Sequence, residues 1–448
     1  MKAFLIGGSA SGVGKTTVTL ALLAALRERG LRVQPFKAGP DFIDPGHHEA
    51  VCGVASHTLD DWMIPAEENR RLFWRAARRR DVAVVEGMMG LFDGVAGGSE
   101  EGSSAALAKR LGLPVVLVLD AGGAVRSAAA TLRGFRDFDP GVRLAGVVFN
   151  RVGGREHLAD LVAAAAPLGV PVLGGLPWQP AATVPERHLG LVTADEAPWS
   201  RERVQRLGEL GRTHLDLGRL LAETEVPEPP GVPAEPASLP ARVRVAVARD
   251  AAFCFYYRDN MDRLARAGGE LVSFSPLRDA ALPPGTGLVY LGGGYPELHA
   301  ARLAANAAGR AALRAFAAAG GAVYAECGGL MYLAEALRAV DGSVHPMCGV
   351  LPLAVRMEPR LTALRYVEAR IDLGDGRALR ARGHEYHHSA LEGPPPPDLD
   401  TVSALTDARG RSLGREGYRV GRTLASYVHL HFASCPELPA RLLEEAVR

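Results

Sequence analysis

The sequence has few cysteines, almost no net charge and no long apolar run. Its five cysteines, among 448 residues, lack C-x-x-C spacing, which argues against a zinc site and against a disulfide framework. A formal net charge of +1 gives no global attraction for nucleic acid or for an anionic membrane. No uninterrupted apolar stretch is long enough to span a bilayer, and the N-terminus runs straight into an apolar strand pattern without a cleavable leader. These absences predict a cytoplasmic protein that binds neither nucleic acid nor membrane.

The remaining composition is that of an ordinary globular protein, with 48% hydrophobic and 23% charged residues. The length is enough for two or three domains. Residues 223–240 contain six prolines and four acidic residues but few apolar ones, which predicts an extended linker. We therefore expect one domain over residues 1–222, a linker over 223–241 and a second domain over 242–448.

The stretch around which the chain is organised runs from residue 4 to residue 17, FLIGGSASGVGKTT. An apolar run predicts a buried strand, a Gly/Ser loop follows, and a helical pattern begins at Lys15. Loop N–H groups and the positive helix end suit a phosphate, Lys15 adds a point charge, and the Thr16 hydroxyl can hold Mg²⁺. Ser9 stands where the common phosphate loop has its first glycine, and Gly8 lies one place earlier, so this loop is one residue longer. The predicted ATP-binding residues are Gly12, Val13, Gly14, Lys15, Thr16 and Thr17.

Acidic residues follow two further strand patterns. The strand expected over 31–36 leads into a Pro/Gly-rich turn with Asp41 and Asp44, at the end of a strand where α/β sheets bind ligands. Simple turn chemistry explains these acids equally well, and both interpretations stay open. The strand over 81–86 closes on Glu86, the usual position in a phosphate-loop domain for a group that holds Mg²⁺ or positions water. A salt bridge to an arginine is the alternative for Glu86.

Three more strand patterns, over residues 113–120, 144–150 and 171–177, alternate with helical ones. This alternation predicts an α/β fold with a mostly parallel, doubly wound sheet. Asn150, followed by Arg151 just past its strand, is a candidate for contacting the nucleotide base.

In the second half, a strand pattern ends at Cys327 and a helical pattern begins directly after it. This arrangement is typical of a nucleophile elbow with cysteine in place of serine. The two glycines after the cysteine allow a sharp turn, and we expect the helix N-terminus to lower the pKa of the thiol. The N–H of Gly328 and one from the Gly292–Gly294 loop, for which we choose Gly293, would form an oxyanion hole. An inert buried cysteine is the competing interpretation.

A cysteine nucleophile needs a base, and two histidine-rich segments offer one. His429 lies at the end of a strand pattern near the C-terminus, and His431 follows as the weaker candidate. Three more histidines, His384, His387 and His388, lie within residues 383–389.

A nucleotide site and a thiol hydrolase on one chain suggest a single reaction. A cysteine that attacks an amide forms a thioester and releases ammonia, and ATP can convert an unreactive carboxylate into an acyl phosphate. The combination predicts an ATP- and glutamine-dependent amide synthase, that is, a glutamine-hydrolysing carbon–nitrogen ligase.

Five stretches, in order along essentially the whole chain, resemble the cobyrinic acid (hydrogenobyrinic acid) a,c-diamide synthase family of cobalamin biosynthesis. They are residues 36–48, FKAGPDFIDPGHH; 85–94, VEGMMGLFDG; 185–191, PERHLGL; 324–332, YAECGGLMY; and 426–432, SYVHLHF.

This resemblance implies a dethiobiotin-synthetase-like phosphate-loop domain followed by a class I glutamine amidotransferase domain. It implies ATP, glutamine and cobyrinate or hydrogenobyrinate as substrates, amidated at the c and then the a carboxylate. By motif, Thr16, Asp41 and Glu86 are the expected Mg²⁺ ligands, and Asp44 lies near the acceptor carboxylate. Cys327 matches the glutaminase nucleophile and His429 its base. No Pro-Glu follows that histidine, so the third residue of the triad stays open.

Two alternatives keep the chemistry and change the substrate: Ni-sirohydrochlorin a,c-diamide synthase and cobyric acid synthase. A third, of another class, is a regulatory phosphate-loop ATPase whose hydrolase-like domain only binds. The segment 383–389 is a candidate for contacting the tetrapyrrole. Pairing of the domains within one chain or across a homodimer stays open.

Overall fold

The computed structural model describes residues 1–179, 186–187, 190–194, 196–228, 231, 237–374 and 376–447. The chain forms two compact units, residues Met1–Ala234 and Glu235–Arg448, and the division falls inside the proline-rich segment. Much of that segment, residues 229–230 and 232–236, lies outside the described residues, as do residues 185, 188 and 189 of the PERHLGL motif. No helix in the described part of the chain is long and apolar enough to cross a membrane.

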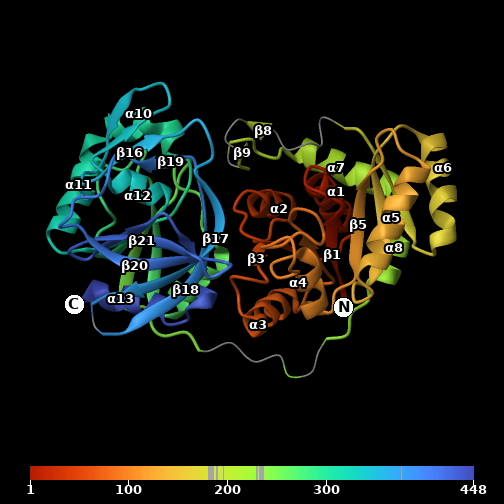
Figure 1. Cartoon of the computed structure of the whole chain (residues 1–448), viewed down its shortest axis with the longest axis horizontal. Helices are drawn as coiled ribbons and strands as arrows, with labels where there is room; N and C mark the ends of the chain where they lie inside the picture. The colour runs from red at the N-terminus through yellow and green to blue at the C-terminus, as the bar shows by residue number, and fades with distance from the viewer. Residues whose placement is uncertain are drawn as a thin grey trace. The chain divides into compact units, whose positions relative to one another are not determined.

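The first unit is built on a seven-stranded, fully parallel sheet in the order β3-β2-β4-β1-β5-β6-β7 (Figure 1). This confirms the predicted α/β fold. Only the short edge strand β3 has no counterpart among the predicted strands. The strands are β1 (Lys2–Gly8), β2 (Val33–Ala38), β3 (His57–Leu59), β4 (Val82–Glu86), β5 (Val115–Asp120), β6 (Leu144–Val152) and β7 (Val172–Pro177); β8 (Glu186–Arg187) and β9 (Gly190–Leu191) form a separate hairpin.

Helices cover both faces of this sheet. Because side chains alternate along a strand, Ala3 and Leu5 join one core cluster and Phe4 and Ile6 the other. Helices α3 to α6 pack on the first cluster, and α1, α2, α7 and α8 on the second. The helices are α1 (Lys15–Glu28), α2 (Asp44–Cys52), α3 (Ala66–Ala77), α4 (Ser104–Leu111), α5 (Arg126–Phe138), α6 (Arg155–Ala165), α7 (Arg201–His214) and α8 (Leu217–Glu223).

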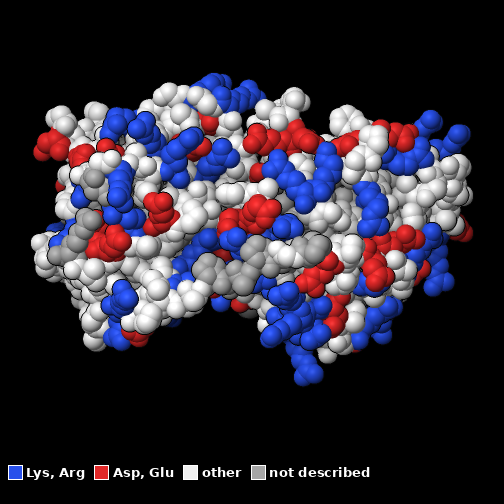
Figure 2. Space-filling view, turned by 90° about the horizontal axis from the view of Figure 1, so that it is seen from below, with Lys and Arg blue, Asp and Glu red and all other residues white. Residues whose placement is uncertain are grey.

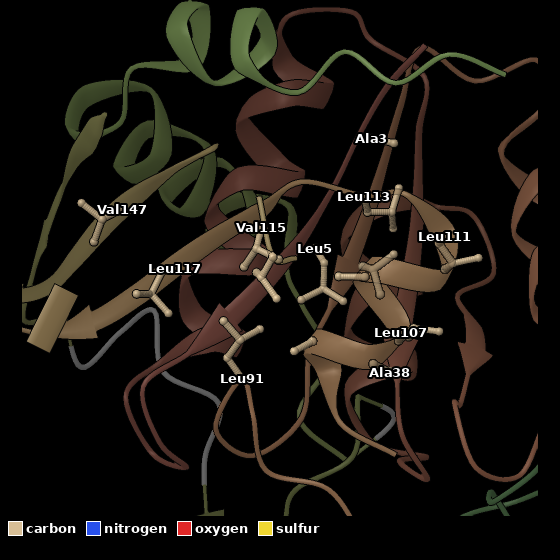
Figure 3. Close-up of a cluster of buried hydrophobic side chains, with 14 of the residues drawn as sticks. Ala3, Leu5, Ala38, Leu91, Leu107, Leu111, Leu113, Val115, Leu117 and Val147 are labelled. Carbon is tan, nitrogen blue, oxygen red and sulfur yellow. The ribbon is translucent and has the colours of Figure 1, made fainter. Parts of the chain in front are cut away.

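Figure 3 shows side chains of the first cluster along the strands, with Leu91 beside Leu5 and Val115. A Cβ on Gly7 would lie 2.8 Å from the Leu91 side chain, so the glycine makes room for this leucine. Burying a leucine side chain contributes about 1.5–3 kcal/mol. Leu91 therefore anchors the loop after β4 to the core next to the phosphate loop.

The second unit has a ten-stranded mixed sheet in the order β11-β10-β12-β13-β22-β21-β20-β17-β18-β23. Pairing is parallel from β11 to β22 and antiparallel from β22 to β23. The antiparallel half adds a long hairpin, β17 with β18, that the sequence patterns did not predict. The strands are β10 (Val243–Ala248), β11 (Gly269–Phe274), β12 (Thr286–Leu291), β13 (Ala322–Glu326), β17 (Ala363–Asp372), β18 (Ala378–His387), β20 (Asp400–Asp407), β21 (Ser412–Val420), β22 (Thr423–Ser426) and β23 (His429–Leu430).

Helices again pack on both faces of the second sheet, with α9 and α13 on one cluster and α10 to α12 on the other. The helices are α9 (Arg258–Arg266), α10 (Ala300–Ala305), α11 (Ala307–Ala318), α12 (Gly328–Leu333) and α13 (Leu438–Val447); a small four-stranded sheet holds β14 (Ala336–Arg338), β15 (Val344–Pro346), β16 (Ala354–Met357) and β19 (Ser389–Leu391). On the surface seen in Figure 2, acidic and basic side chains are interspersed, in keeping with the net charge of +1.

Candidate active site

The phosphate loop, residues 9–14, leads from β1 into α1. Gly12 and Gly14 adopt φ angles of 77° and 93°, which favour glycine. A Cβ on Gly14 would lie 2.0 Å from the Asn150 amide nitrogen, so the loop also needs glycine for close packing. The Asn150 Nδ2 donates to the Val13 carbonyl at 2.8 Å and thereby joins the end of β6 to the loop.

Lys15 lies at the start of α1, mostly buried. Its ammonium donates to the carbonyls of Ala10 at 3.1 Å and of Met89 at 2.5 Å. Burial, and after it the charge of Lys37, lowers the pKa of Lys15 to about 8. The lysine thus joins the phosphate loop to the loop after β4.

The three predicted acids of the first half lie together as a carboxylate cluster (Asp41, Asp44 and Glu86). Lys37, the penultimate residue of β2, sits among them. Its Nζ donates to Asp44, lies 3.0 Å from a Glu86 oxygen and lies 3.6 Å from an Asp41 oxygen. Burial alone would lower the pKa of Lys37, but these carboxylates raise it well above its ordinary value. The cluster is therefore neutralised in part by a buried lysine.

Thr16 and His48 complete the surroundings of Glu86. The Thr16 hydroxyl donates to Glu86 at 2.7 Å, and the His48 Nε2 lies 2.8 Å from the second Glu86 oxygen. Burial opposes ionisation of Glu86, but Lys37, His48 and Thr16 outweigh it and lower its pKa. Glu86 is consequently held as a carboxylate, with no arginine among these partners.

The donors around Thr16 fit a magnesium ion that is shared with a nucleotide. They are oxygens, which Mg²⁺ prefers: the Thr16 hydroxyl lies 2.7 Å from a Glu86 oxygen, and Lys37 holds Asp41 in the same cluster as Glu86. Mg²⁺ usually takes one or two carboxylates together with substrate phosphates rather than an all-protein cage. Among the described residues, no group of three or more His, Cys, Asp and Glu side chains could hold a metal ion by itself.

Arg151 and Trp178 lie next to Asn150, at the ends of β6 and β7. The Arg151 guanidinium pairs with Asp120, donates to the Gly12 carbonyl at 3.0 Å and lies 5.3 Å from the centre of the Trp178 ring. Trp178 is 58% exposed. An exposed aromatic ring beside a phosphate loop offers a stacking surface for a nucleobase, a role that sequence reasoning gave to Asn150 alone.

In the second unit, Cys327 occupies the sharp turn between β13 and α12 that the sequence predicted. It has φ 47° and ψ −101°, a strained conformation for a residue with a side chain, and Cys327 N–H donates to the Ser426 carbonyl at 2.7 Å. The expectation of a lowered thiol pKa is wrong for this structure. Burial, with Glu297 as the next cause, raises the pKa of Cys327, and the Gly328 N–H opposes this only in part.

The Gly292–Gly294 loop lies against the helix that begins after Cys327. A Cβ on Gly328 would come within 3.2 Å of the Gly294 nitrogen, and a Cβ on Gly293 would come within 2.3 Å of the His429 ring. The Gly293 carbonyl accepts the N–H groups of residues 254 and 255, which fixes the loop. The structure thus brings the glycine loop, the elbow and His429 together.

His429 lies on β23, paired with His384 on β18, and the two imidazole rings stack at 4.9 Å. Burial lowers the pKa of His429 to about 3 and that of His431 to about 4. His431 packs instead against Tyr257, with ring centres 4.7 Å apart. Of these two histidines, His429 is the one beside the Gly292–Gly294 loop, and its part as the base stays a prediction.

Lys37 and His48 were given no role by sequence reasoning, although both lie within the stretch FKAGPDFIDPGHH. Their partner Glu86 is 49 and 38 residues away along the chain. The signal that could have identified Lys37 in the sequence is its position at the end of an apolar strand pattern, just before two acids.

Comparison with known proteins gives two matches to family models. Residues 4–192 match the CobQ/CobB/MinD/ParA nucleotide binding domain, and residues 244–436 match the CobB/CobQ-like glutamine amidotransferase domain.

Curated relatives match the whole chain. The cobyrinate a,c-diamide synthase of Salmonella typhimurium is 43% identical and covers 100% of this chain and 98% of its own length. That of Syntrophotalea carbinolica is 44% identical over 96% of both chains, and that of Streptococcus sanguinis 41% identical over 99% of both. The chain therefore belongs to the cobyrinate a,c-diamide synthase family.

Proposed function

We propose that this chain amidates the a and c carboxylates of cobyrinate, with ATP as the activating substrate and glutamine as the nitrogen source. The observation that carries the proposal is the strained Cys327 elbow on the same chain as a phosphate loop faced by buried acids. Residues 1–222 would activate the carboxylate, and residues 242–448 would release ammonia. Hydrogenobyrinate is the closely related alternative substrate.

Activation takes place at the phosphate loop. Residues Gly12–Thr17 bind the phosphates, with Lys15 leaving its two carbonyl partners for the transferred phosphoryl group, and Asn150 faces the base. An oxygen of the substrate carboxylate attacks the γ-phosphorus, the bond to the β-phosphate oxygen breaks, and an acyl phosphate and ADP result. Asp44 lies beside the acceptor carboxylate and orients it.

Thr16, Asp41 and Glu86 are the residues proposed to hold Mg²⁺. When bound, the ion neutralises charge on the phosphates during transfer. Lys37 already neutralises part of the negative charge of the same three carboxylates, which allows them to lie together in a buried site.

Ammonia is released at the elbow. His429 takes the thiol proton of Cys327, whose sulfur attacks the glutamine carboxamide carbon, and the N–H groups of Gly328 and Gly293 bind the oxyanion. The tetrahedral intermediate collapses to a thioester as His429 returns the proton to the leaving ammonia. Water then hydrolyses the thioester to glutamate. Ammonia displaces phosphate from the acyl phosphate, and a second round amidates the other carboxylate.

The two half-reactions can be separated with Cys327→Ala. We expect wild type to form the diamide of cobyrinate with ATP and Mg²⁺ and either glutamine or ammonia, and the variant to do so with ammonia alone. Mass spectrometry of the product distinguishes these cases. Glutamine-supported amidation by the variant would show that Cys327 is not the glutaminase nucleophile. An absence of amidation by wild type with both nitrogen sources would refute the assignment to cobyrinate.

A further inference from the structure

A cavity of about 410 Å³ opens beside the phosphate loop, within the first unit. Its lining combines three aromatic rings with the start of the phosphate loop: Phe92, Phe135 and Phe138, together with Ser9, Gly90 and Asp93. This volume falls within the range usual for ligand sites, which are mostly apolar with a few polar groups. None of the roles proposed above uses it.

The three phenylalanines form one surface, here called the aromatic shelf (Phe92, Phe135 and Phe138). The ring of Phe92 stacks on that of Phe135, with centres 5.5 Å apart and planes 21° from parallel, and lies 4.7 Å from that of Phe138. Phe138 is 73% exposed, more than any other large hydrophobic side chain in the described structure. Phe92 and Phe135 are half-buried and pack against the first core cluster, and Phe138 continues this apolar surface into solvent. An apolar surface that extends into solvent in this way indicates a binding site.

Helix α5 presents this surface in addition to its core-facing side. Thr131, Gly134, Phe135 and Phe138 all line the cavity. Gly134 and Phe135 each follow Thr131 and precede Phe138 by three or four residues, so the four share one face of the helix. Ala128 and Leu132 are the residues of α5 that are buried in the core. A Cβ on Gly134 would meet no atom within 4 Å, so the glycine leaves the cavity open at this point.

The shelf is joined directly to the phosphate-transfer site. The Leu91 N–H donates to the Gly8 carbonyl at 2.8 Å, and the Gly90 N–H donates to Asp93 at 3.0 Å. One residue earlier, the Met89 carbonyl accepts from Lys15. A ligand lying on the shelf therefore has its edge next to the phosphate loop.

We propose that the aromatic shelf binds the face of the tetrapyrrole-derived ring of the substrate, with one peripheral carboxylate directed to the phosphate loop. This inference rests on the proposed function, which requires a broad ring with apolar faces and carboxylates at its rim. Apolar contact is non-directional. The shelf can thus hold the ring in two orientations, as amidation of two carboxylates at one phosphate loop demands.

Two substitutions test the shelf without disturbing the core. Phe138→Ala removes its most exposed ring, and Gly134→Leu fills the open part of the cavity and suits a helix better than glycine. Val162→Ala is the matched control, since Val162 is an apolar residue of α6, 42% exposed, outside the cavity. Equilibrium dialysis of cobyrinate, detected by its visible absorbance, gives its dissociation constant, and amidation assays give KM and kcat.

We expect Phe138→Ala, which removes one aromatic contact, and Gly134→Leu, which fills the space for the ring, each to raise the dissociation constant and the KM for cobyrinate by about tenfold. The KM for ATP, the rate of glutamine hydrolysis and all values for Val162→Ala should stay as in wild type. Equal dissociation constants of cobyrinate for wild type and both shelf variants, or no binding by wild type, would refute the proposal that the shelf binds the substrate. Failure of the proposed function is a different result, in which wild type binds cobyrinate but does not amidate it.

Discussion

At the scale of single residues, the phosphate-loop site depends on charges that are buried together. Lys37 is the clearest case, because it holds the carboxylate cluster from β2 while remaining only 4% exposed. Taking one partner out of such a group leaves the others uncompensated, which is far more damaging than breaking a surface pair.

Lys37→Met should therefore lower the free energy of unfolding of the first unit by about 3 kcal/mol or more. Lys2→Met, which breaks an exposed pair with Glu225, should lower it by less than about 1 kcal/mol. All four tryptophans lie in the first unit, so urea unfolding followed by tryptophan fluorescence reports on it. Equal, small effects of the two substitutions would show that the buried lysine does not hold the cluster.

Glu326, directly before Cys327, makes the second unit sensitive to pH. Burial raises the pKa of Glu326 to about 7, although the hydroxyls of Tyr324 and Tyr290 donate to it. Between its ordinary value of 4.5 and 7 the folded state binds the proton more tightly than the unfolded state. Ionisation then opposes folding, and stability falls as the pH rises through this window.

Glu326→Gln removes this ionisation. Relative to the variant, wild type should lose stability on the order of 3 kcal/mol between pH 4.5 and pH 8. Hydrogen exchange of peptides from β13, compared between the two proteins at each pH, measures the difference. Glu444→Gln, at an exposed position on α13, is the control. A gap between wild type and Glu326→Gln that does not vary with pH would contradict the raised pKa.

At the scale of elements, the elbow depends on how closely α12 approaches β12. A Cβ on Gly329 would lie 2.4 Å from the Leu291 carbonyl oxygen, so an alanine there must displace the helix that follows Cys327. A shift of about 1 Å in a catalytic group can lower a rate about a hundredfold.

We expect Gly329→Ala to lower glutamine-supported amidation by about a hundredfold and to spare ammonia-supported amidation. Gly98→Ala, where a Cβ meets no atom within 4 Å, is the control. The test compares the rates of glutamine-supported and ammonia-supported amidation under saturating ATP. A parallel loss of both activities would mean that the substitution unfolds more than the elbow.

Elements with one strong local pattern were predictable from sequence. The phosphate loop, the five other predicted strands of the first sheet and the Cys327 elbow each contain an apolar run, in most cases followed by a glycine turn, and the structure has them close to the expected positions. The hairpin of β17 and β18 was not predicted, because it has no continuous apolar run. In residues 367–372 buried apolar residues alternate with charged ones, and one of these, Glu368, pairs with Arg382 across the hairpin.

Contacts between distant segments were beyond such patterns. Lys37 and Glu86 both precede loops, but only the pairing of β2 with β4 brings them side by side. The aromatic shelf could not be predicted from the sequence for the same reason, since Phe92 and Phe138 meet only when α5 packs on the sheet.

At the scale of the whole molecule, each unit carries one half of a reaction. The first has a lysine, a threonine and acids suited to phosphoryl transfer, and the second has a cysteine elbow suited to amide hydrolysis. Neither half alone converts a carboxylate into an amide with glutamine. The central claim is therefore that the chain transfers glutamine nitrogen to two carboxylates of cobyrinate at the expense of ATP.

The most direct measurement supplies cobyrinate, ATP and Mg²⁺ with glutamine labelled with ¹⁵N at its amide, and follows the product by mass spectrometry and ADP release together. We expect a diamide carrying two ¹⁵N atoms, with two ATP consumed for each molecule formed. ATP hydrolysis that continues while cobyrinate stays unlabelled would contradict the claim and indicate an ATPase whose second unit serves another purpose.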